Sequence, residues 1–72
     1  MKAQIELETQ TDVMNFVKIV TEIEEDVTVT DGDGLRVNGK SLMGMLYALE
    51  FNELWCECQV DIYQKIKNYI VE

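Results

Sequence analysis

Apolar and polar residues alternate at the start of the chain and then change to a helical spacing. Residues 3–8 place Ala3, Ile5 and Leu7 on one side, as in a half-buried strand. Further along, apolar residues recur three or four positions apart, which is the spacing of one helix face: Val13, Phe16, Val17, Val20 and Ile23. The pattern predicts a strand at residues 3–8 and a helix over about residues 11–23, with a cap supplied by residues 9–12.

The middle of the chain indicates a hairpin that leads into a second helix. Residues 26–30 and 35–37 alternate on either side of a glycine-rich turn, which is typical of antiparallel strands. Asn38 and Gly39 end this pattern, and Ser41 is a preferred helix cap. The residues behind it have helical spacing and predict a short amphipathic helix that ends near residues 50–52: Leu42, Met43, Met45, Leu46 and Leu49.

The last third of the chain predicts one more strand and one more helix. In residues 53–59, Leu54, Cys56 and Cys58 fall on one face and Trp55 on the other. The apolar face of the final helix is expected to hold Ile62, Ile66, Tyr69 and Ile70. The order strand, helix, strand, strand, helix, strand, helix predicts one domain over residues 1–72, an α+β open-faced sandwich with a four-stranded sheet covered by helices on one face.

Charge and composition narrow the classes of partner. Six basic and fourteen acidic residues give a net charge of −8, which disfavours nucleic acid and anionic membrane surfaces as partners. No apolar run approaches the roughly 20 residues that span a bilayer. The amino terminus alternates apolar with charged residues instead of showing the apolar core of a signal peptide. The sequence therefore predicts a cytoplasmic location.

No metal or cofactor is expected. Cys56 and Cys58 lie two apart in a strand, with Cα atoms ~6.6 Å apart, so we interpret them as reduced core thiols. The chain has no histidine, so it lacks the further ligands that a four-ligand zinc site needs. Asp31 and Asp33 lack the remaining ligands of an EF-hand and are interpreted as a solvated turn.

The segment Lys40-Ser41-Leu42-Met43-Gly44-Met45 resembles the regulatory-serine segment of HPr, the histidine-containing phosphocarrier protein of the bacterial sugar phosphotransferase system. The order of elements is also that of the HPr family. The resemblance implies a four-stranded antiparallel sheet with three helices on one face, in the order βαββαβα. It also places Ser41 at the position of the regulatory phosphoserine of HPr from low-GC Gram-positive bacteria.

The active-site string of the same family, His-Ala-Arg-Pro, falls on residues 9–12. Thr9 stands at the position of the histidine that accepts phosphate from Enzyme I, and Thr11 at that of the arginine. A threonine phosphate ester would be a poor onward donor. Asp12 also brings a carboxylate to a helix start, where an anion would otherwise be attracted. The residues at these positions therefore predict a relative that is not competent as a phosphohistidine carrier, and no enzyme activity is expected.

Each candidate site residue has two interpretations. Ser41 is either a regulatory phosphorylation site or a plain helix cap. Met43, Met45 and Leu46 correspond to the apolar patch that partners of HPr use, but methionines at helical spacing are also typical of a core. Trp55 is either an interface anchor or a side chain that lies across the uncovered sheet face.

The leading hypothesis is a regulatory or protein-binding relative of HPr, within or beside the sugar phosphotransferase system. Its expected partners are proteins, including phosphotransferase-system or HPr-kinase components. One alternative is a working phosphocarrier that uses the hydroxyl group of Thr9, Thr11 or Ser41. The other alternative is a stand-alone protein-interaction domain unrelated to sugar transport.

Overall fold

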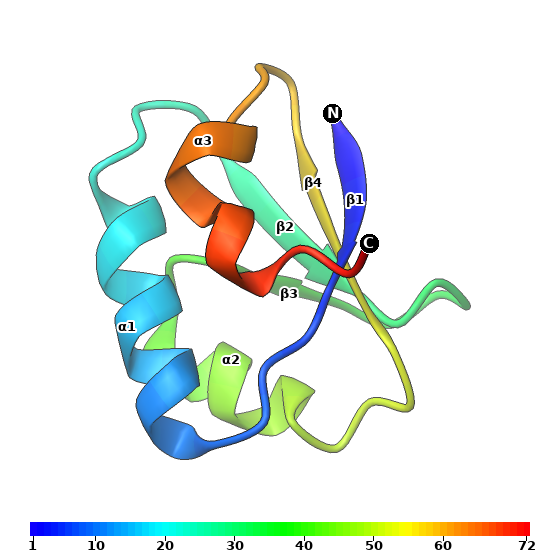
Figure 1. Cartoon of the computed structure of the whole chain (residues 1–72). Helices are drawn as coiled ribbons and strands as arrows, with labels where there is room; N and C mark the ends of the chain where they lie inside the picture. The colour runs from blue at the N-terminus through cyan, green and yellow to red at the C-terminus, as the bar shows by residue number, and fades with distance from the viewer.

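The computed structural model describes residues 1–72 as an α+β fold with a four-stranded antiparallel sheet and three α-helices (Figure 1). A single 3₁₀ turn, η1, follows the last helix. The elements in chain order are β1 (Lys2–Ile5), α1 (Gln10–Thr21), β2 (Val27–Thr30), β3 (Arg36–Asn38), α2 (Leu42–Ala48), β4 (Leu54–Cys58), α3 (Tyr63–Ile66) and η1 (Lys67–Tyr69).

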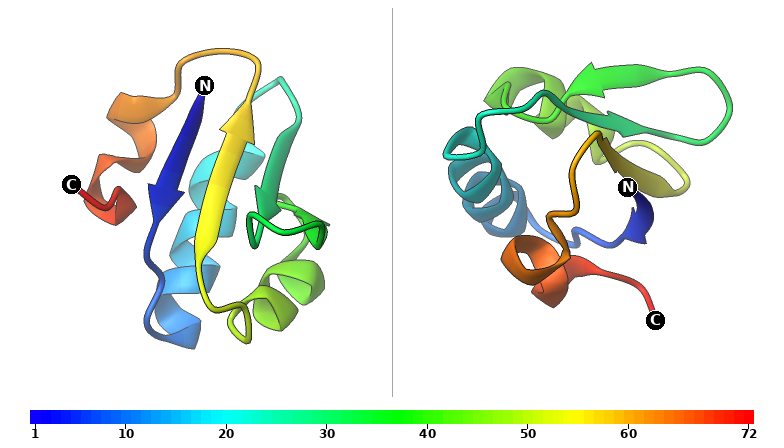
Figure 2. Two further views of the ribbon diagram at one scale, coloured as in Figure 1. Left: turned by 90° about the vertical axis from the view of Figure 1, so that its right-hand side faces the viewer. Right: turned by 90° about the horizontal axis from the view of Figure 1, so that it is seen from above.

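The strands follow the order β1-β4-β2-β3 across the sheet, so the last strand in sequence lies between the first two. β4 pairs with β1 through partners such as Ile5 and Leu54, and with β2 through partners such as Val29 and Cys56. The helices gather on one side of the sheet, and its other side is open (Figure 2). The alternation of apolar residues predicts which face of each strand is buried, but not this strand order.

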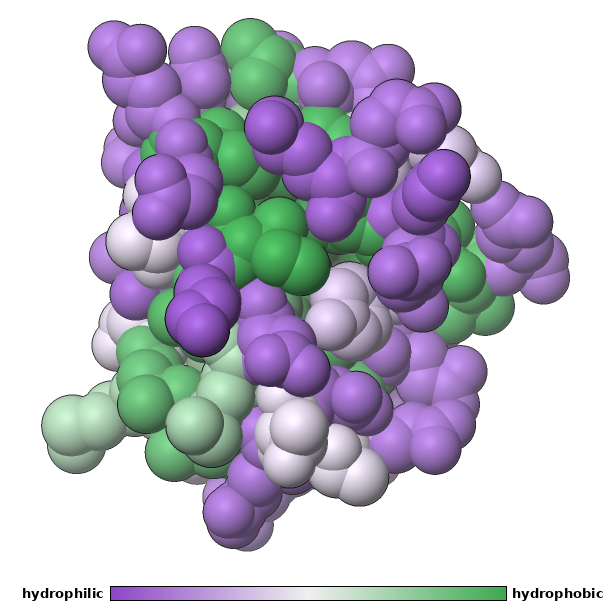
Figure 3. Space-filling view, turned by 60° about the vertical axis from the view of Figure 1, so that its left-hand side comes forward, coloured by the Kyte–Doolittle hydropathy of each residue, from purple (hydrophilic) through white to green (hydrophobic).

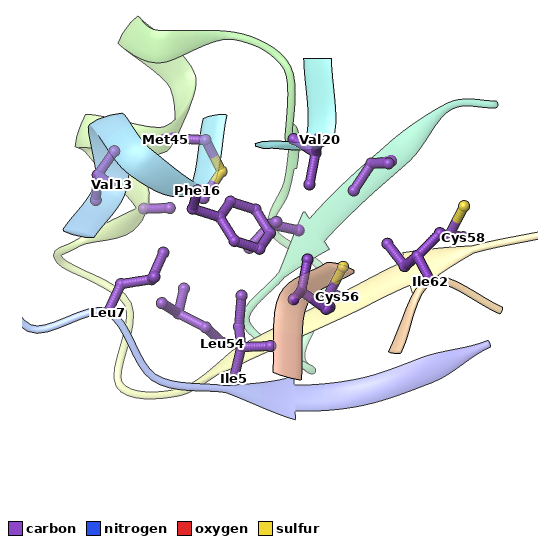
Figure 4. Packing of buried hydrophobic residues seen from close by; sticks show 14 of the residues in the cluster. Ile5, Leu7, Val13, Phe16, Val20, Met45, Leu54, Cys56, Cys58 and Ile62 are labelled. Carbon is purple, nitrogen blue, oxygen red and sulfur yellow. The ribbon is translucent and has the colours of Figure 1, made fainter. Parts of the chain in front are cut away.

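The core lies between the sheet and the helices. Leu54, Cys56 and Cys58 of β4 are buried, and they alternate with less buried neighbours as the sequence predicts. Phe16 of α1 and Met45 of α2 are fully buried and point into the same interior (Figure 4). Fifteen buried residues form one cluster, so the chain has a single core.

The hairpin and the first two helices are confirmed to within a few residues. The first strand is shorter than predicted, because it ends at Ile5, although Leu7 remains buried beyond it. The final helix is confirmed, but it is shorter than the predicted apolar face from Ile62 to Ile70. The helix changes to a 3₁₀ turn at Lys67, and Ile70 forms an isolated bridge with Ile5.

Hydrogen bonds to β1 explain this correction. The backbone N–H of Val71 donates to the carbonyl oxygen of Gln4 at 2.9 Å, and that of Glu6 donates to the carbonyl oxygen of Tyr69 at 2.8 Å. The free edge of β1 thus gains partners only if the chain leaves the helix before residue 70. None of the helices combines the length and the apolar character needed to cross a bilayer.

Candidate functional site

The turn between β3 and α2 is fixed by four consecutive residues. The side-chain oxygen of Asn38 accepts a hydrogen bond from the backbone N–H of Lys40 at 2.9 Å. The backbone carbonyl oxygen of Asn38 accepts one from the backbone N–H of Ser41 at 3.0 Å. Gly39 lies against β2, because an added Cβ atom would be only 2.9 Å from Val27 Cγ1. The chain therefore enters α2 in one defined direction.

Ser41 caps α2 as the sequence predicts. Its Oγ atom accepts a hydrogen bond from the backbone N–H of Gly44 at 3.2 Å, and its own backbone is extended. The side chain is half-buried. The hydroxyl group is thus in use as a cap.

The exposed side of α2 carries apolar side chains. Met43 is the most exposed, at 84%, and Leu42, Leu46 and Tyr47 are exposed as well. We call these four residues the α2 patch. In the space-filling view they lie over α2, at the lower left, where apolar side chains protrude (Figure 3). An apolar surface of this kind is typical of a binding site for another protein.

Met45 does not belong to this patch, which corrects its place among the candidate partner-binding residues. Its exposed fraction is 0%, because it points between α1 and the sheet (Figure 4). Tyr47 was missed by the sequence reasoning, although it follows Met43 by four positions and therefore shares its helix face. The ring of Tyr47 packs edge-to-face on Phe51, with ring centroids 5.6 Å apart.

The start of α1 is capped by its own side chains. Thr9 Oγ1 accepts from the backbone N–H of Asp12 at 3.1 Å, and Asp12 Oδ2 accepts from the backbone N–H of Glu8 at 3.0 Å. The Thr9 side chain thus satisfies a free N–H group of the helix start, and the Asp12 carboxylate ties the residue before the cap to the helix. Thr11 is exposed and makes no side-chain hydrogen bond. The carboxylate of Asp12 therefore occupies the anion-attracting end of this helix.

Tyr69 lies close to the same helix start. Its ring packs edge-to-face on Phe16, with centroids 5.8 Å apart. Burial raises the pKa of the Tyr69 hydroxyl, and the negative charge of Asp12 raises it further. The C-terminal segment thus brings an aromatic ring, and no cation, to the start of α1.

Trp55 lies on the open sheet face and is half-buried. A Cβ on Gly32 would be 3.2 Å from the indole ring, so the hairpin turn covers part of it. The ammonium group of Lys2 lies 5.6 Å from the ring centroid, within the range of a cation–π contact. Thr30, the register partner of Trp55, is only 3% exposed. These contacts fit a side chain that lies across its neighbours on the sheet.

A charged group beside Trp55 was not found from the sequence. Glu57 Oε1 accepts from Arg36 Nη2 at 2.7 Å, and Glu57 Oε2 lies 3.6 Å from Lys2 Nζ. The hydrogen bond from Arg36 lowers the pKa of Glu57, and the charges of Arg36 and Lys2 add to this effect. The register that pairs Lys2 with Glu57 joins residues from opposite ends of the chain, so no local pattern signals the group.

The two cysteines are free and buried. Burial raises the pKa of the Cys56 thiol from 9.0 to about 12, with a smaller contribution from Cys58. No group of three or more histidine, cysteine or acidic side chains is placed to hold a metal ion. The thiol of Cys56 is therefore protonated at neutral pH and packs as a core side chain.

Comparisons of the chain with protein-family models, with curated proteins and with solved structures give no match.

Proposed function

We propose that this chain is an HPr-like, cytoplasmic protein that binds or regulates protein partners and does not carry phosphohistidine. Three features support the proposal: the element order βαββαβα, the antiparallel sheet with helices gathered on one side, and the string from Lys40 to Met45. The net charge of −8 favours protein partners over nucleic acid.

The observation that carries the proposal is the exposed α2 patch directly behind Ser41. Met43 lies two positions after the Ser41 cap and is 84% exposed, whereas Met45, two positions further on, is fully buried. A flexible methionine with exposed leucines and a tyrosine beside it suits a surface that adapts to a partner. The same segment carries the resemblance to the regulatory region of HPr.

The residues at the start of α1 support the absence of carrier chemistry. A phosphohistidine carrier needs a nitrogen nucleophile that also leaves readily, and the chain has no histidine. Thr9 accepts a hydrogen bond from Asp12, so its hydroxyl oxygen is part of a helix cap. A phosphate at Thr9 would also meet the carboxylate of Asp12. The alternative of a hydroxyl-based carrier has no support from this geometry.

Ser41 is the proposed regulatory position within this function. In the modification, the Ser41 oxygen attacks the γ-phosphorus of ATP, the bond to the bridging oxygen breaks, ADP leaves, and the hydroxyl proton passes to a base of the kinase. The new phosphate would stand at the start of α2, where free N–H groups favour negative charge. The hydrogen bond from Gly44 would then be made to a phosphorylated oxygen or lost.

Two labelling experiments test the proposal. With Enzyme I and labelled phosphoenolpyruvate, the chain should take up no acid-labile phosphate, whereas an HPr control should be labelled. With HPr kinase and ATP, the mass should rise by one phosphate in the wild type and stay unchanged in Ser41→Ala. Acid-labile label on the chain would overturn the proposal. An unmodified mass would remove Ser41 as a regulatory site.

A binding experiment tests the α2 patch by itself. Met43→Glu should abolish capture of phosphotransferase-system proteins or HPr kinase. Met14→Glu is the matched control, because Met14 is an exposed methionine on α1. Equal capture by both variants would show that the α2 patch is not the binding surface.

A further inference from the structure

Lys40 reaches from the turn before α2 to the segment that follows α1. Its ammonium group donates to the backbone carbonyl oxygen of Ile23 and lies 3.5 Å from that of Glu24. Both carbonyls belong to the connection between α1 and β2. Carbonyl groups that are withdrawn from water need partners, and a charged donor makes the stronger hydrogen bond. One of only six basic side chains in this acidic protein is used in this way.

The backbone of Lys40 is tied to the turn that begins α2. Its N–H donates to the side chain of Asn38 at 2.9 Å, and the next N–H, from Ser41, donates to the Asn38 carbonyl oxygen at 3.0 Å. The Ser41 hydroxyl in turn accepts from Gly44. A single residue therefore connects the cap of α2 with the segment that leads into β2, the other strand of the hairpin.

The connected segment is acidic. Glu24, Glu25 and Asp26 follow one another there, and Lys40 approaches its carbonyl groups rather than its carboxylates. Just before these residues, the N–H of Ile23 donates to the carbonyl oxygen of Val20 at 3.0 Å. Removal of the Lys40 ammonium would leave the Ile23 carbonyl without this donor.

We infer that Lys40 couples the Ser41 turn to the acidic segment at residues 22–26, so that the two segments open and close together. Lys40 is thus a positioning residue that transmits changes between two sites. Its regulatory meaning rests on the proposed function: a phosphate or a partner at Ser41 changes how the acidic segment is presented. The coupling itself exists without either of them.

Native-state amide exchange of the unmodified protein tests the coupling. In Lys40→Met, which keeps a long apolar stem, the N–H groups of Ile23 and Ser41 should both exchange faster. We expect a roughly three- to tenfold increase relative to the amides of β4, the size that the loss of one hydrogen bond gives. Lys65→Met is the matched control, because the side chain of Lys65 is exposed and makes no hydrogen bond or salt bridge. It should leave both amides unchanged.

A double-mutant cycle tests whether the effect of the Ser41 turn on Ile23 passes through Lys40, or whether Lys40→Met only destabilises both segments independently. Asn38→Ala removes the acceptor for the Lys40 N–H and should speed exchange at Ile23 when Lys40 is present. In the Lys40→Met background the same change should have no further effect at Ile23. An equal effect in both backgrounds would show that the change reaches Ile23 without Lys40, and would overturn the inference.

The experiment also distinguishes this inference from the proposed function. If HPr kinase does not modify Ser41, the proposed regulatory site fails, and the cycle still decides the coupling. If Ser41 is modified, its phosphorylation should alter exchange at Ile23 in the wild type and not in Lys40→Met. The same alteration in both proteins would also overturn the role of Lys40.

Discussion

The Oγ1 atom of Thr9 accepts a hydrogen bond from the backbone N–H of Asp12 at 3.1 Å. The resemblance to HPr places Thr9 at the position of the phosphate-accepting histidine. In this chain the side chain at that position is a helix cap, and the residue that it caps brings a carboxylate to the helix start. The Thr9 hydroxyl oxygen and the Asp12 carboxylate are therefore both engaged in the cap of α1.

Thr9→Ala should destabilise the protein, because α1 would lose its side-chain cap. The expected decrease in the free energy of unfolding is about 1 kcal/mol. Urea denaturation followed by the Trp55 fluorescence or by circular dichroism would measure it. Thr11→Ala is the control, since Thr11 is exposed and makes no side-chain hydrogen bond, and it should change stability little. Equal losses in the two variants would contradict the cap.

Met43 and Met45 should respond in opposite ways to substitution. Met45→Ala removes a fully buried side chain and should cost about 2 to 5 kcal/mol in the free energy of unfolding. Met43→Ala should change stability by no more than about 0.5 kcal/mol, because Met43 is an exposed position. Thermal or urea unfolding of both variants checks this. A large loss in Met43→Ala would mean that the α2 patch is part of the core.

Cys56 should make the protein less stable at alkaline pH. Its pKa is about 12 in the folded protein and 9.0 ordinarily, so the unfolded chain releases the proton first. Stability from this group is fully present below pH 9 and decreases as the pH rises toward 12. Over this window the wild type should lose on the order of 1 kcal/mol more per pH unit than Cys56→Ala. If urea denaturation gave the same pH dependence of the free energy of unfolding for the wild type and for Cys56→Ala, this prediction would be contradicted.

Arg36→Gln should raise the pKa of Glu57 toward its ordinary value of 4.5, because the largest cause of its lowering is the hydrogen bond from Arg36. In the wild type this pair stabilises the folded state above the ordinary pKa, and the contribution is lost as the pH falls. An NMR titration of the Glu57 carboxyl group measures the change. Lys2→Gln is the comparison and should have the smaller effect, since Lys2 is 3.6 Å away.

The spacing of apolar residues along the sequence was sufficient to predict most of the helices and strands. Alternation identified the buried face of β4, and a serine before an apolar helical run identified the cap of α2. The reciprocal cap at Thr9 and Asp12 was also predicted, because capping depends on residues three or four positions apart. These features depend on neighbours along the chain, and such neighbours are visible in a sequence.

Tertiary structure decided what depends on residues far apart in sequence. The C-terminal segment leaves its helix because β1 offers a free edge, which the helical spacing of Ile66 and Ile70 does not show. Packing against α1 and the sheet buries Met45 completely and leaves Met43 exposed.

The sequence by itself thus determined most of the helices and strands, the caps of α1 and α2, and the absence of a histidine nucleophile. The folded chain alone determined the strand order, the composition of the α2 patch and the position of Lys40 against the Ile23 carbonyl oxygen. The physical reason is that helix and strand periods follow from short-range backbone geometry, whereas sheet order and side-chain contacts arise when distant segments share one core.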